Sequence, residues 1–343
     1  MSEDFARIEA VSRRFTPRLS VGDRIAAALG APVDTRTVHA VDGVSLTIRK
    51  GEVLGLVGES GCGKSTLGRV LTGILPPSAG KVSVAGEPVM SAGPKPVKLT
   101  RRVQMVFQNP YASLNPRMRV GEAVAEGPLA HGLTTGAEAG DYVASWLARV
   151  GLDPAFASRY PHQFSGGQRQ RIAIARALAM QPDMLVCDEP VASLDVSIQA
   201  QIVNLFLQLR RELGLTMLFI SHDLGVVRHL CDRVAVMYLG RIVEVANVAD
   251  LYARPMHPYA RALLDSLPQL RLDDDALVTF RAVAGELPSP LAPPPGCHFN
   301  PRCPRVEPIC RTLRPALDTL LPGHAVACHV AQAEAAAASP PAG

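Results

Sequence analysis

Apolar residues near the N-terminus predict two strands that lead into a helix. Residues 41–49 alternate between apolar and polar positions, and after a turn at Lys50 and Gly51 the run Val53–Val57 is apolar throughout. Alternation is typical of a half-buried strand, whereas a short continuous run is typical of a buried one. Residues 64–75 then follow helical spacing up to Pro76, which cannot extend a helix. We therefore predict the order strand, glycine-rich loop, helix.

Strands and helices continue to alternate along the chain. Shorter apolar runs predict strands at residues 82–84 and 103–107. Two further runs, at residues 184–187 and 216–220, end in polar residues and flank a predicted helix at residues 197–213. This alternation indicates an α/β fold with a parallel sheet and right-handed crossovers. The polar residues after such strands are expected at the carboxyl edge of the sheet.

Pattern and composition divide the chain into three segments. Helical patterning from about residue 109 to 180 predicts a helical subdomain inside a first domain that spans residues 1–250. Five of the eight residues 288–295 are proline, which indicates an extended linker within a C-terminal segment, residues 251–330. The alanine-rich residues 331–343 are predicted to be a mobile tail without a function.

Composition places the chain among globular proteins with an ordinary core. Of its 343 residues, 48% are hydrophobic and 19% are charged, and its 35 Lys and Arg exceed its 31 Asp and Glu by only 4. Such a small excess does not indicate a nucleic-acid partner. No apolar run approaches the ~18 residues that a membrane span requires, and the N-terminal MSEDFARIEA lacks the pattern of a secretory signal. We therefore expect a cytoplasmic location.

A glycine-rich stretch between the second strand and the helix carries the strongest chemical signal. Gly58 and Gly63 are separated by four residues, and Lys64 follows directly. This spacing is typical of polyphosphate binding, because glycine lets the backbone approach the phosphates and the helix N-terminus attracts anions. We expect Lys64 to reach the β- and γ-phosphates and Ser65 to bind Mg²⁺. A plain turn before a core helix is the alternative. The candidate nucleotide-binding residues are Gly58, Glu59, Ser60, Gly61, Cys62, Gly63, Lys64, Ser65 and Thr66.

Two adjacent acids form the second candidate group. Asp188 and Glu189 come directly after the apolar run at residues 184–187. At the end of a buried strand, Asp188 can hold Mg²⁺ and Glu189 can orient and deprotonate an attacking water. A solvated turn is the alternative, but the apolar run before the pair argues against it.

The stretch FSGGQRQRIAIARAL, residues 164–178, predicts a second anion site. Ser165, Gly166, Gly167 and Gln168 precede a helix in which bases alternate with aliphatic residues. Ser165 can cap that helix, whose N–H groups can attract a phosphate; a mere loop and cap is the alternative. One γ-phosphate does not need two such sites within one chain. A head-to-tail pair, in which Ser165 of each subunit closes over Lys64 of the other, is a simple solution.

These motifs, in this order, resemble those of the ATP-binding subunits of ABC transporters over about residues 38–245. The set also includes Gln108 after a strand, Ser193–Asp195, and His222 after the strand at residues 216–220. The resemblance implies a P-loop NTPase core with an antiparallel β subdomain and a helical subdomain. It also implies that Gln108 contacts Mg²⁺ and the attacking water, that Asp195 couples the two sites of a dimer, and that His222 hydrogen-bonds the γ-phosphate.

An aromatic residue before the phosphate loop is expected to stack on adenine in such a protein. Phe15 is our candidate and His39 the second choice, although residues 16–37 interrupt the usual spacing. An ordinary core phenylalanine is the alternative for Phe15.

Further stretches are similar to one branch of the family, the importers of dipeptides, oligopeptides and nickel. These are residues 108–127, residues 254–268 and a C-terminal extension that contains cysteines. Four thiolates can hold Zn²⁺ or a 4Fe-4S cluster, and the spacing alone does not decide between them. The resemblance favours the 4Fe-4S cluster, and buried free thiols are the alternative. The candidate ligands are Cys297, Cys303, Cys310 and Cys328, with five, six and seventeen residues between them.

The resemblance implies an ATPase whose turnover powers the import of di- or oligopeptides. The implied partners are integral membrane permease subunits, which dock on residues 111–118, a second identical or homologous ATP-binding subunit and, indirectly, an extracytoplasmic solute-binding protein. The implied location is peripheral, on the cytoplasmic face of the inner membrane. The rival hypotheses are a soluble ABC-type ATPase that acts on nucleic acid or ribosomes, and a regulatory protein that binds ATP without efficient hydrolysis. The sequence lacks the coiled coil or second cassette typical of the first, and Glu189 and His222 argue against the second.

Overall fold

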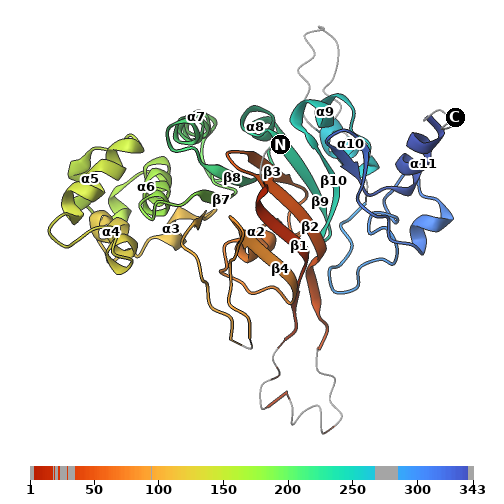
Figure 1. Cartoon of the computed structure of the whole chain (residues 1–343), viewed down its shortest axis with the longest axis horizontal. Helices are drawn as coiled ribbons and strands as arrows, with labels where there is room; N and C mark the ends of the chain where they lie inside the picture. The colour runs from red at the N-terminus through yellow and green to blue at the C-terminus, as the bar shows by residue number, and fades with distance from the viewer. Residues whose placement is uncertain are drawn as a thin grey trace.

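Two β-sheets, a helical region and a C-terminal extension build the molecule (Figure 1). The helical region lies at one end of the view and the C-terminal residues at the other. The C-terminal extension comprises residues 251–266 and 285–338. The computed structural model describes residues 4–17, 19, 22–23, 29, 35–93, 95–266 and 285–338.

The larger sheet has eight strands in the order β11-β12-β10-β9-β3-β8-β7-β6. Strand β3 is parallel to β8 and β9, and β6, β7 and β8 continue the parallel part. Strands β10, β12 and β11 add antiparallel neighbours beyond β9. The strands are β3 Val53–Val57, β6 Val103–Val106, β7 Met184–Asp188, β8 Thr216–Ile220, β9 Arg233–Tyr238, β10 Arg241–Asn247, β11 Asp318–Leu321 and β12 His324–Val326.

The smaller sheet is antiparallel, with the order β2-β1-β4-β5. Helix α2, Lys64–Leu71, contacts strands of both sheets and lies between them. The predicted helix over residues 64–75 is four residues too long, because Gly73 adopts a left-handed conformation (φ +72°) that ends the helix. The strands are β1 Asp4–Phe15, β2 Val38–Arg49, β4 Ala79–Val84 and β5 Glu87–Pro88.

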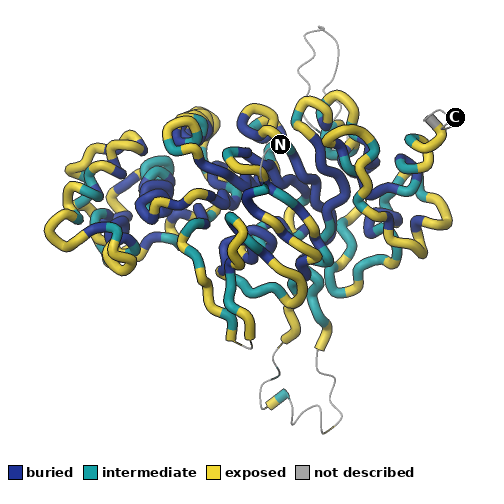
Figure 2. The backbone as a smooth tube through the Cα atoms, in the orientation of Figure 1, coloured by how far each residue is buried: buried dark blue, intermediate teal, exposed yellow. Residues whose placement is uncertain are grey.

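Strand β3 shows why the predicted strands of the larger sheet read as continuous apolar runs. Its successive side chains point to opposite faces of the sheet, and both faces are covered. Leu54 and Leu56 belong to the core shared with α2 and the smaller sheet. Val53 and Val57 belong to a second core formed with the helices on the other face. Figure 2 shows the resulting buried centre between exposed helices.

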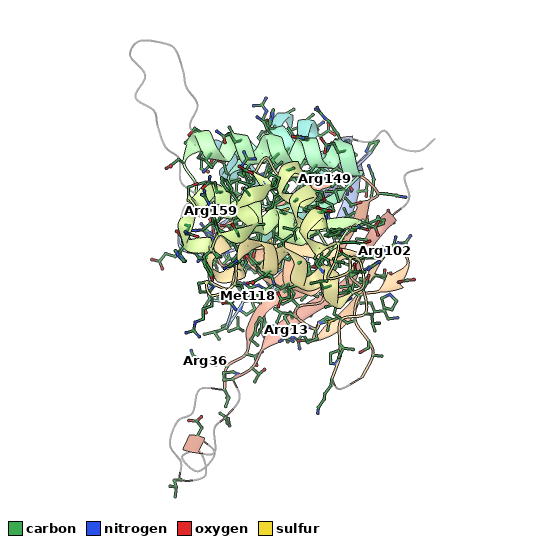
Figure 3. All side chains as sticks on the ribbon, turned by 90° about the vertical axis from the view of Figure 1, so that its left-hand side faces the viewer. Arg13, Arg36, Arg102, Met118, Arg149 and Arg159 are labelled. Atoms are coloured by element: carbon green, nitrogen blue, oxygen red, sulfur yellow. The ribbon has the colours of Figure 1, made fainter. Side chains whose placement is uncertain are left out.

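Helices α3–α6 form the helical region, which Figure 3 shows facing the viewer. Buried Trp146 and Leu147 of α5 belong to the second core, as do Ile172 and Ile174 of α6. The remaining helices are distributed between the larger sheet and the extension. The helices are α3 Pro110–Ser113, α4 Val120–Ala130, α5 Ala139–Arg149, η1 Pro154–Ser158, η2 Pro161–Gln163, α6 Gly166–Leu178, α7 Val196–Leu213, α8 Leu224–Leu230, α9 Val248–Ala253, α10 Pro258–Asp265, η3 Pro308–Arg311 and α11 His329–Ala338.

The C-terminal extension is continuous with the larger sheet, because β12 pairs with β10 and β11 pairs with β12. Residues 331–338, part of the segment predicted to be a mobile tail, belong to α11, and the mobility of that segment stays a prediction. Alanine is the best helix former, and Val330 and Ala331 pack against Met256 and Val326. Residues 339–343 lie outside the described residues.

The predicted fold class is confirmed: a parallel core sheet, an antiparallel sheet and a helical subdomain are all present. The domain boundaries near residues 250 and 330 stay predictions. No helix in the described parts of the chain has both the length and the apolar character needed to cross a membrane.

Candidate functional site

The glycine-rich loop after β3 adopts backbone conformations that only glycine tolerates at two positions. Gly58 has φ +153°, and a Cβ atom there would lie 2.1 Å from the carbonyl oxygen of Met237. Gly63 has φ +110°, and a Cβ atom there would lie 2.1 Å from the carbonyl oxygen of Ala40. The loop, residues 58–63, therefore packs its backbone directly against β9 and β2.

Lys64 closes this loop on itself. Its Nζ donates hydrogen bonds to the carbonyl oxygens of Gly58 (2.7 Å) and Glu59 (2.9 Å). Lys64 is also the first residue of α2, whose first turn contains no acidic residue and no side-chain cap. The N-terminus of α2 therefore presents uncapped backbone N–H groups beside a lysine ammonium, which is a favourable place for an anion.

Ser65 and Asp188 lie together at the carboxyl edge of the larger sheet. The Ser65 hydroxyl donates to Asp188 Oδ1 at 2.7 Å, which joins α2 to the end of β7. Burial raises the pKa of the Asp188 carboxyl above its usual value, although the hydrogen bond from Ser65 opposes this shift. A hydroxyl and a carboxylate at this distance are oxygen donors of the kind that Mg²⁺ prefers.

Glu189 brings three predicted catalytic residues together. Gln108 Nε2 donates to Glu189 Oε2 at 2.9 Å, and His222 Nδ1 lies 3.3 Å from the same oxygen. Glu189 itself has φ +45°, a conformation that is strained for a residue with a side chain. Its backbone N–H donates to the carbonyl oxygen of Ile220 at 3.0 Å, which fixes this turn to the end of β8. The strained turn thus directs the carboxylate toward Gln108 and His222.

The predicted second anion site lies at the start of α6. Ser165 and Gln168 form a reciprocal cap: the Ser165 hydroxyl accepts from the Gln168 N–H (3.3 Å), and the Gln168 side chain accepts from the Ser165 N–H (3.0 Å). Gly167 packs tightly on α7, since a Cβ atom there would lie 2.6 Å from Ile198 Cγ2. Within the described residues, no hydrogen bond joins this cap to the phosphate loop.

Asp195 and Phe15 occupy exposed positions. Asp195 precedes α7 and makes no side-chain cap to it, and the next residue, Val196, is 83% exposed. Phe15 ends β1 beside Val38, is 37% exposed, and has the Arg13 guanidinium 4.6 Å from its ring centroid. This exposure does not fit the alternative that Phe15 is an ordinary core residue.

Two of the four cysteines of the extension are joined through their backbones, since the Cys297 N–H donates to the carbonyl oxygen of Cys310 at 2.9 Å. Burial raises the pKa of the Cys297 thiol to about 11, and the other three cysteines add to this effect. Burial likewise raises the pKa of Cys303 and of Cys328. However, the described residues include no group of three or more His, Cys, Asp or Glu side chains placed to hold a metal ion. The predicted iron–sulfur or zinc site is therefore not supported by the described residues.

Two residues of the extension that the sequence did not single out contact the phosphate loop. Tyr259 accepts a hydrogen bond from the backbone N–H of Glu59, and Arg302 pairs with the Glu59 carboxylate. Tyr259 lies within the stretch RPMHPYARALLDSLP, which stood out in the sequence for its resemblance to the peptide importers. The contact of Tyr259 with Glu59 could not be predicted from that stretch, because it depends on how the chain folds.

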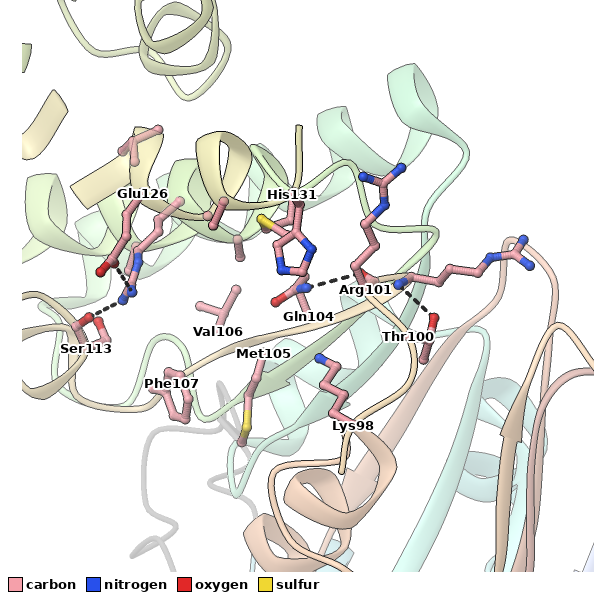
Figure 4. Close-up of a pocket in the computed structure, with 18 of the residues that line it drawn as sticks. Lys98, Thr100, Arg101, Gln104, Met105, Val106, Phe107, Ser113, Glu126 and His131 are labelled. Atoms are coloured by element: carbon pink, nitrogen blue, oxygen red, sulfur yellow. Dashed lines mark hydrogen bonds and ion pairs between the residues drawn. The ribbon is translucent and has the colours of Figure 1, made fainter. Parts of the chain in front are cut away.

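A pocket of about 880 Å³ lies between β6, α4 and α6. Its apolar lining includes Met105, Val106 and Phe107, the residues that lead into Gln108. The side chains of Lys98 and His131 point into it (Figure 4). The loop that follows Gln108 is fixed to α6 nearby, because Arg176 donates to the carbonyl oxygen of Ser113 and the Arg169 guanidinium lies 3.9 Å from the Tyr111 ring centroid.

Comparison with known families gives two matches. Residues 41–192 match the family model described as "ABC transporter". Residues 243–310 match the model described as "Oligopeptide/dipeptide transporter, C-terminal region".

Curated relatives and solved structures agree with these matches. The chain is 50% identical over 295 residues to the oligopeptide transport ATP-binding protein AppF of Bacillus subtilis, covering 85% of this chain and 90% of that protein. It is 54% identical over 297 residues to the putative peptide import ATP-binding protein BAB2_1053 of Brucella abortus, covering 85% and 87%. The ATP-binding cassette MJ0796, solved as a dimer bound to ADP and Pi, is similar with a TM-score of 0.58 at 26% identity, covering 71% of this chain and 98% of that one. The cbiO1 protein of Clostridium perfringens, part of an ABC transporter complex, has a TM-score of 0.57 at 29% identity, covering 74% and 92%.

Proposed function

Since this chain belongs to the family of ABC transporter ATP-binding subunits, we propose that it hydrolyses ATP to power import of di- or oligopeptides through a membrane permease. The observation that carries the proposal is the convergence of Gln108 and His222 on Glu189, beside the Ser65–Asp188 pair. The names of the relatives, an oligopeptide transport protein and a peptide import protein, support the class of solute.

Hydrolysis requires a base, positive charge and an ordered water. Glu189 is the proposed general base, since its carboxylate is held at the sheet edge where the γ-phosphate of ATP is expected. Gln108 orients the attacking water, and His222 donates to the γ-phosphate. Lys64 exchanges its bonds to Gly58 and Glu59 for bonds to the β- and γ-phosphates, which offsets their charge.

Mg²⁺ would be held by Ser65, Asp188 and Gln108, where it would neutralise charge on the phosphates. The hydroxyl and carboxylate oxygens that lie 2.7 Å apart fit this hard cation. The Ser65 hydroxyl, which donates to Asp188 here, would then be free to serve as an oxygen ligand. Adenine stacks on the exposed ring of Phe15, with His39 as the second candidate.

A second ATP-binding subunit completes each site. The N-terminus of α6, with Ser165, Gly166, Gly167 and Gln168, makes no hydrogen bond to its own phosphate loop within the described residues. We assign it to the γ-phosphate of the partner subunit, with Asp195 coupling the two sites. If the partner is a second copy, mixing the inactive variants Lys64→Ala and Ser165→Arg restores ATPase activity, because one site of the mixed pair keeps both halves intact.

The permease docks on residues 111–118 and on the adjoining pocket of about 880 Å³ between β6, α4 and α6, which Ser113 of that segment also lines. The floor of this pocket is apolar, and its lining carries both bases (Lys98, Arg101, Arg102 and Arg176) and acids (Glu87 and Glu126), which suits an amphipathic permease helix. Figure 4 shows that the floor continues into the strand before Gln108. Docking here would place the subunit at the cytoplasmic face of the inner membrane, and the permease would link it indirectly to an extracytoplasmic solute-binding protein.

The four cysteines Cys297, Cys303, Cys310 and Cys328 remain candidates for a 4Fe-4S cluster. The support for this proposal is the presence of four cysteines in an extension that resembles that of the peptide importers, because the described residues contain no group of side chains placed to hold a metal ion. Metal and sulfide analysis of anaerobically purified protein tests this, with Zn²⁺ or free thiols as the opposing results.

Purification of the native complex tests the proposed function. We expect integral membrane subunits to copurify, and reconstituted vesicles to accumulate labelled peptide only with ATP present. The same complex carrying Glu189→Gln should assemble but accumulate none. Copurification of nucleic acid or ribosomes in place of membrane subunits would support the rival hypothesis instead.

A further inference from the structure

Glu59 of the phosphate loop is held by two residues of the C-terminal extension. Its backbone N–H donates to the Tyr259 hydroxyl at 2.8 Å, and Tyr259 is fully buried. Its carboxylate accepts hydrogen bonds from both terminal nitrogens of Arg302, at 2.7 and 2.9 Å. Only 6% of the Arg302 side chain is exposed. Although 24% of the Glu59 side chain is exposed, a partly buried bidentate pair of this kind is a strong and directional contact.

Aromatic rings keep these two residues in place. Tyr259 packs edge-on against Tyr238 (4.7 Å between centroids), and Phe299 lies 5.1 Å from Tyr238 and 5.4 Å from Tyr259. The Arg302 guanidinium lies 5.8 Å from the Tyr238 ring centroid. Tyr238 belongs to β9, Tyr259 to α10 and Phe299 to a loop later in the extension, so three segments far apart in the sequence meet behind one residue of the phosphate loop.

Arg302 and Phe299 belong to a short loop, residues 298–302, which we call the arm. Cys297 precedes the arm and Cys303 follows it. The Cys297 N–H donates to the carbonyl oxygen of Cys310 at 2.9 Å, so the arm is anchored within the cysteine group. On the arm itself, His298 Nδ1 lies 2.9 Å from the carbonyl oxygen of Leu239. The arm therefore connects Cys297, Cys303 and Cys310 to the phosphate loop.

We propose that Arg302 is a positioning residue for ATP, through which the cysteine-bearing extension sets the nucleotide affinity of the phosphate loop. Without Arg302, the negative charge of Glu59 would remain uncompensated on the loop that receives a polyphosphate. Like charges at short distance in a partly buried site repel strongly. Arg302 cancels this charge and, with Tyr259, fixes the shape of the loop when Lys64 leaves its carbonyl partners. The proposal rests on the proposed ATP site.

Nucleotide affinity and steady-state kinetics of the full chain test the proposal. Arg302→Ala should raise the Kd and the KM for ATP by about tenfold and leave kcat within about twofold, because Arg302 does not contact Glu189. Arg302→Lys should recover part of the loss. The matched control is Arg305→Ala, since Arg305 lies in the same segment but pairs with Glu334 of α11. Equal ATP affinity in the two alanine variants would overturn the proposal.

A rescue experiment separates charge compensation from general damage to the fold. Adding Glu59→Gln to Arg302→Ala should restore much of the ATP affinity, because the uncompensated charge is removed; a further loss would contradict the mechanism. Cys303→Ser should raise the KM in the same direction, with no further increase in the double variant with Arg302→Ala. An unchanged KM in Cys303→Ser would overturn the link to the cysteines. Lys64→Ala serves as the reference: if it binds ATP normally, the proposed ATP site itself fails, which is a different result from failure of Arg302 alone.

Discussion

The candidate ATP site contains two groups of contacts that differ in what ATP would do to them. The catalytic contacts, made by Lys64, Ser65–Asp188 and Glu189, join polar groups that must change partners when ATP and Mg²⁺ bind. The extension contacts, made by Tyr259 and Arg302, are buried and need not change. We call the catalytic contacts, which change partners, the temporary set, and the extension contacts, which do not, the permanent set. The temporary set performs the chemistry, and the permanent set fixes the conformation of the phosphate loop. Variants of the first should abolish turnover, whereas variants of the second should shift affinity or stability.

The largest effect is expected for Glu189→Gln, which removes the proposed base but keeps the shape of the side chain. We expect kcat to fall by ~10²- to 10⁴-fold while ATP remains bound and the dimer stays closed. Steady-state ATPase assays and size-exclusion chromatography with ATP measure the two effects. Glu212→Gln, on the exposed side of α7, is the matched control and should behave like the native chain. Normal turnover in Glu189→Gln would remove this residue from the role of base.

The second-largest effect is expected for Lys64→Ala. This variant removes the ammonium group that donates to the loop carbonyls and is expected to bind the phosphates. The Kd for ATP should rise ~10- to 100-fold, as measured by titration with a fluorescent analogue. Lys81→Ala, at an exposed position of β4, should leave the Kd unchanged. If both variants bind ATP equally well, Lys64 does not contact the phosphates and the proposed ATP site fails.

His257 predicts a pH dependence of the permanent set. Burial lowers its pKa from 6.5 to about 3, and its Nδ1 accepts the Tyr259 N–H at 3.0 Å, which caps α10. Because the unfolded chain binds this proton more readily, the stability contributed by neutral His257 is present above pH 6.5 and lost as pH falls toward 3. Lowering the pH from 7 to 5 should cost about 2 kcal/mol of unfolding free energy from this residue.

Urea denaturation at the two pH values measures this loss. His257→Asn is the control, since asparagine caps a helix but does not titrate. The variant should lose about 2 kcal/mol less than the native chain between pH 7 and pH 5. An equal loss in both proteins would mean that other groups govern the acid sensitivity.

The smallest effect is expected for Phe15→Ala, because the ring offers only one stacking contact at an exposed position. The Kd for ATP should rise about fivefold, and Phe15→Tyr should restore it. Comparing the Kd values for ATP and GTP would show whether the site distinguishes one base from another. A rise in His39→Ala but not in Phe15→Ala would assign the stacking role to the second candidate.

The sequence predicted the catalytic contacts better than the extension contacts for a physical reason. Asp188 and His222 follow apolar strands directly, so a parallel sheet must bring them to one edge. Tyr259 and Arg302 reach Glu59 across 200 and 243 positions of the chain, and no local pattern encodes that meeting. Their contact depends on how β9, α10 and the arm pack together.

Two structural elements were missed for other reasons. Strand β1 lacks a clear period because its pairing with β2 contains several register shifts. Helix α11 was assigned to a tail because alanine carries little hydrophobic signal, although its helix propensity is high. By contrast, the apolar β3, β7 and β8 were predicted to within one residue because both faces of their sheet are covered.

Strand β12 has a consequence for how this chain can be shortened. By pairing with Glu244 and Val245 it covers β10, whose buried Glu244 carboxylate also bonds His324 at 2.6 Å. A protein cut after residue 250 would expose a row of backbone groups and leave an acid without its imidazole partner. Such a fragment would expose an unpaired edge strand that can associate with other chains. The ATPase core should therefore be expressed together with its C-terminal extension.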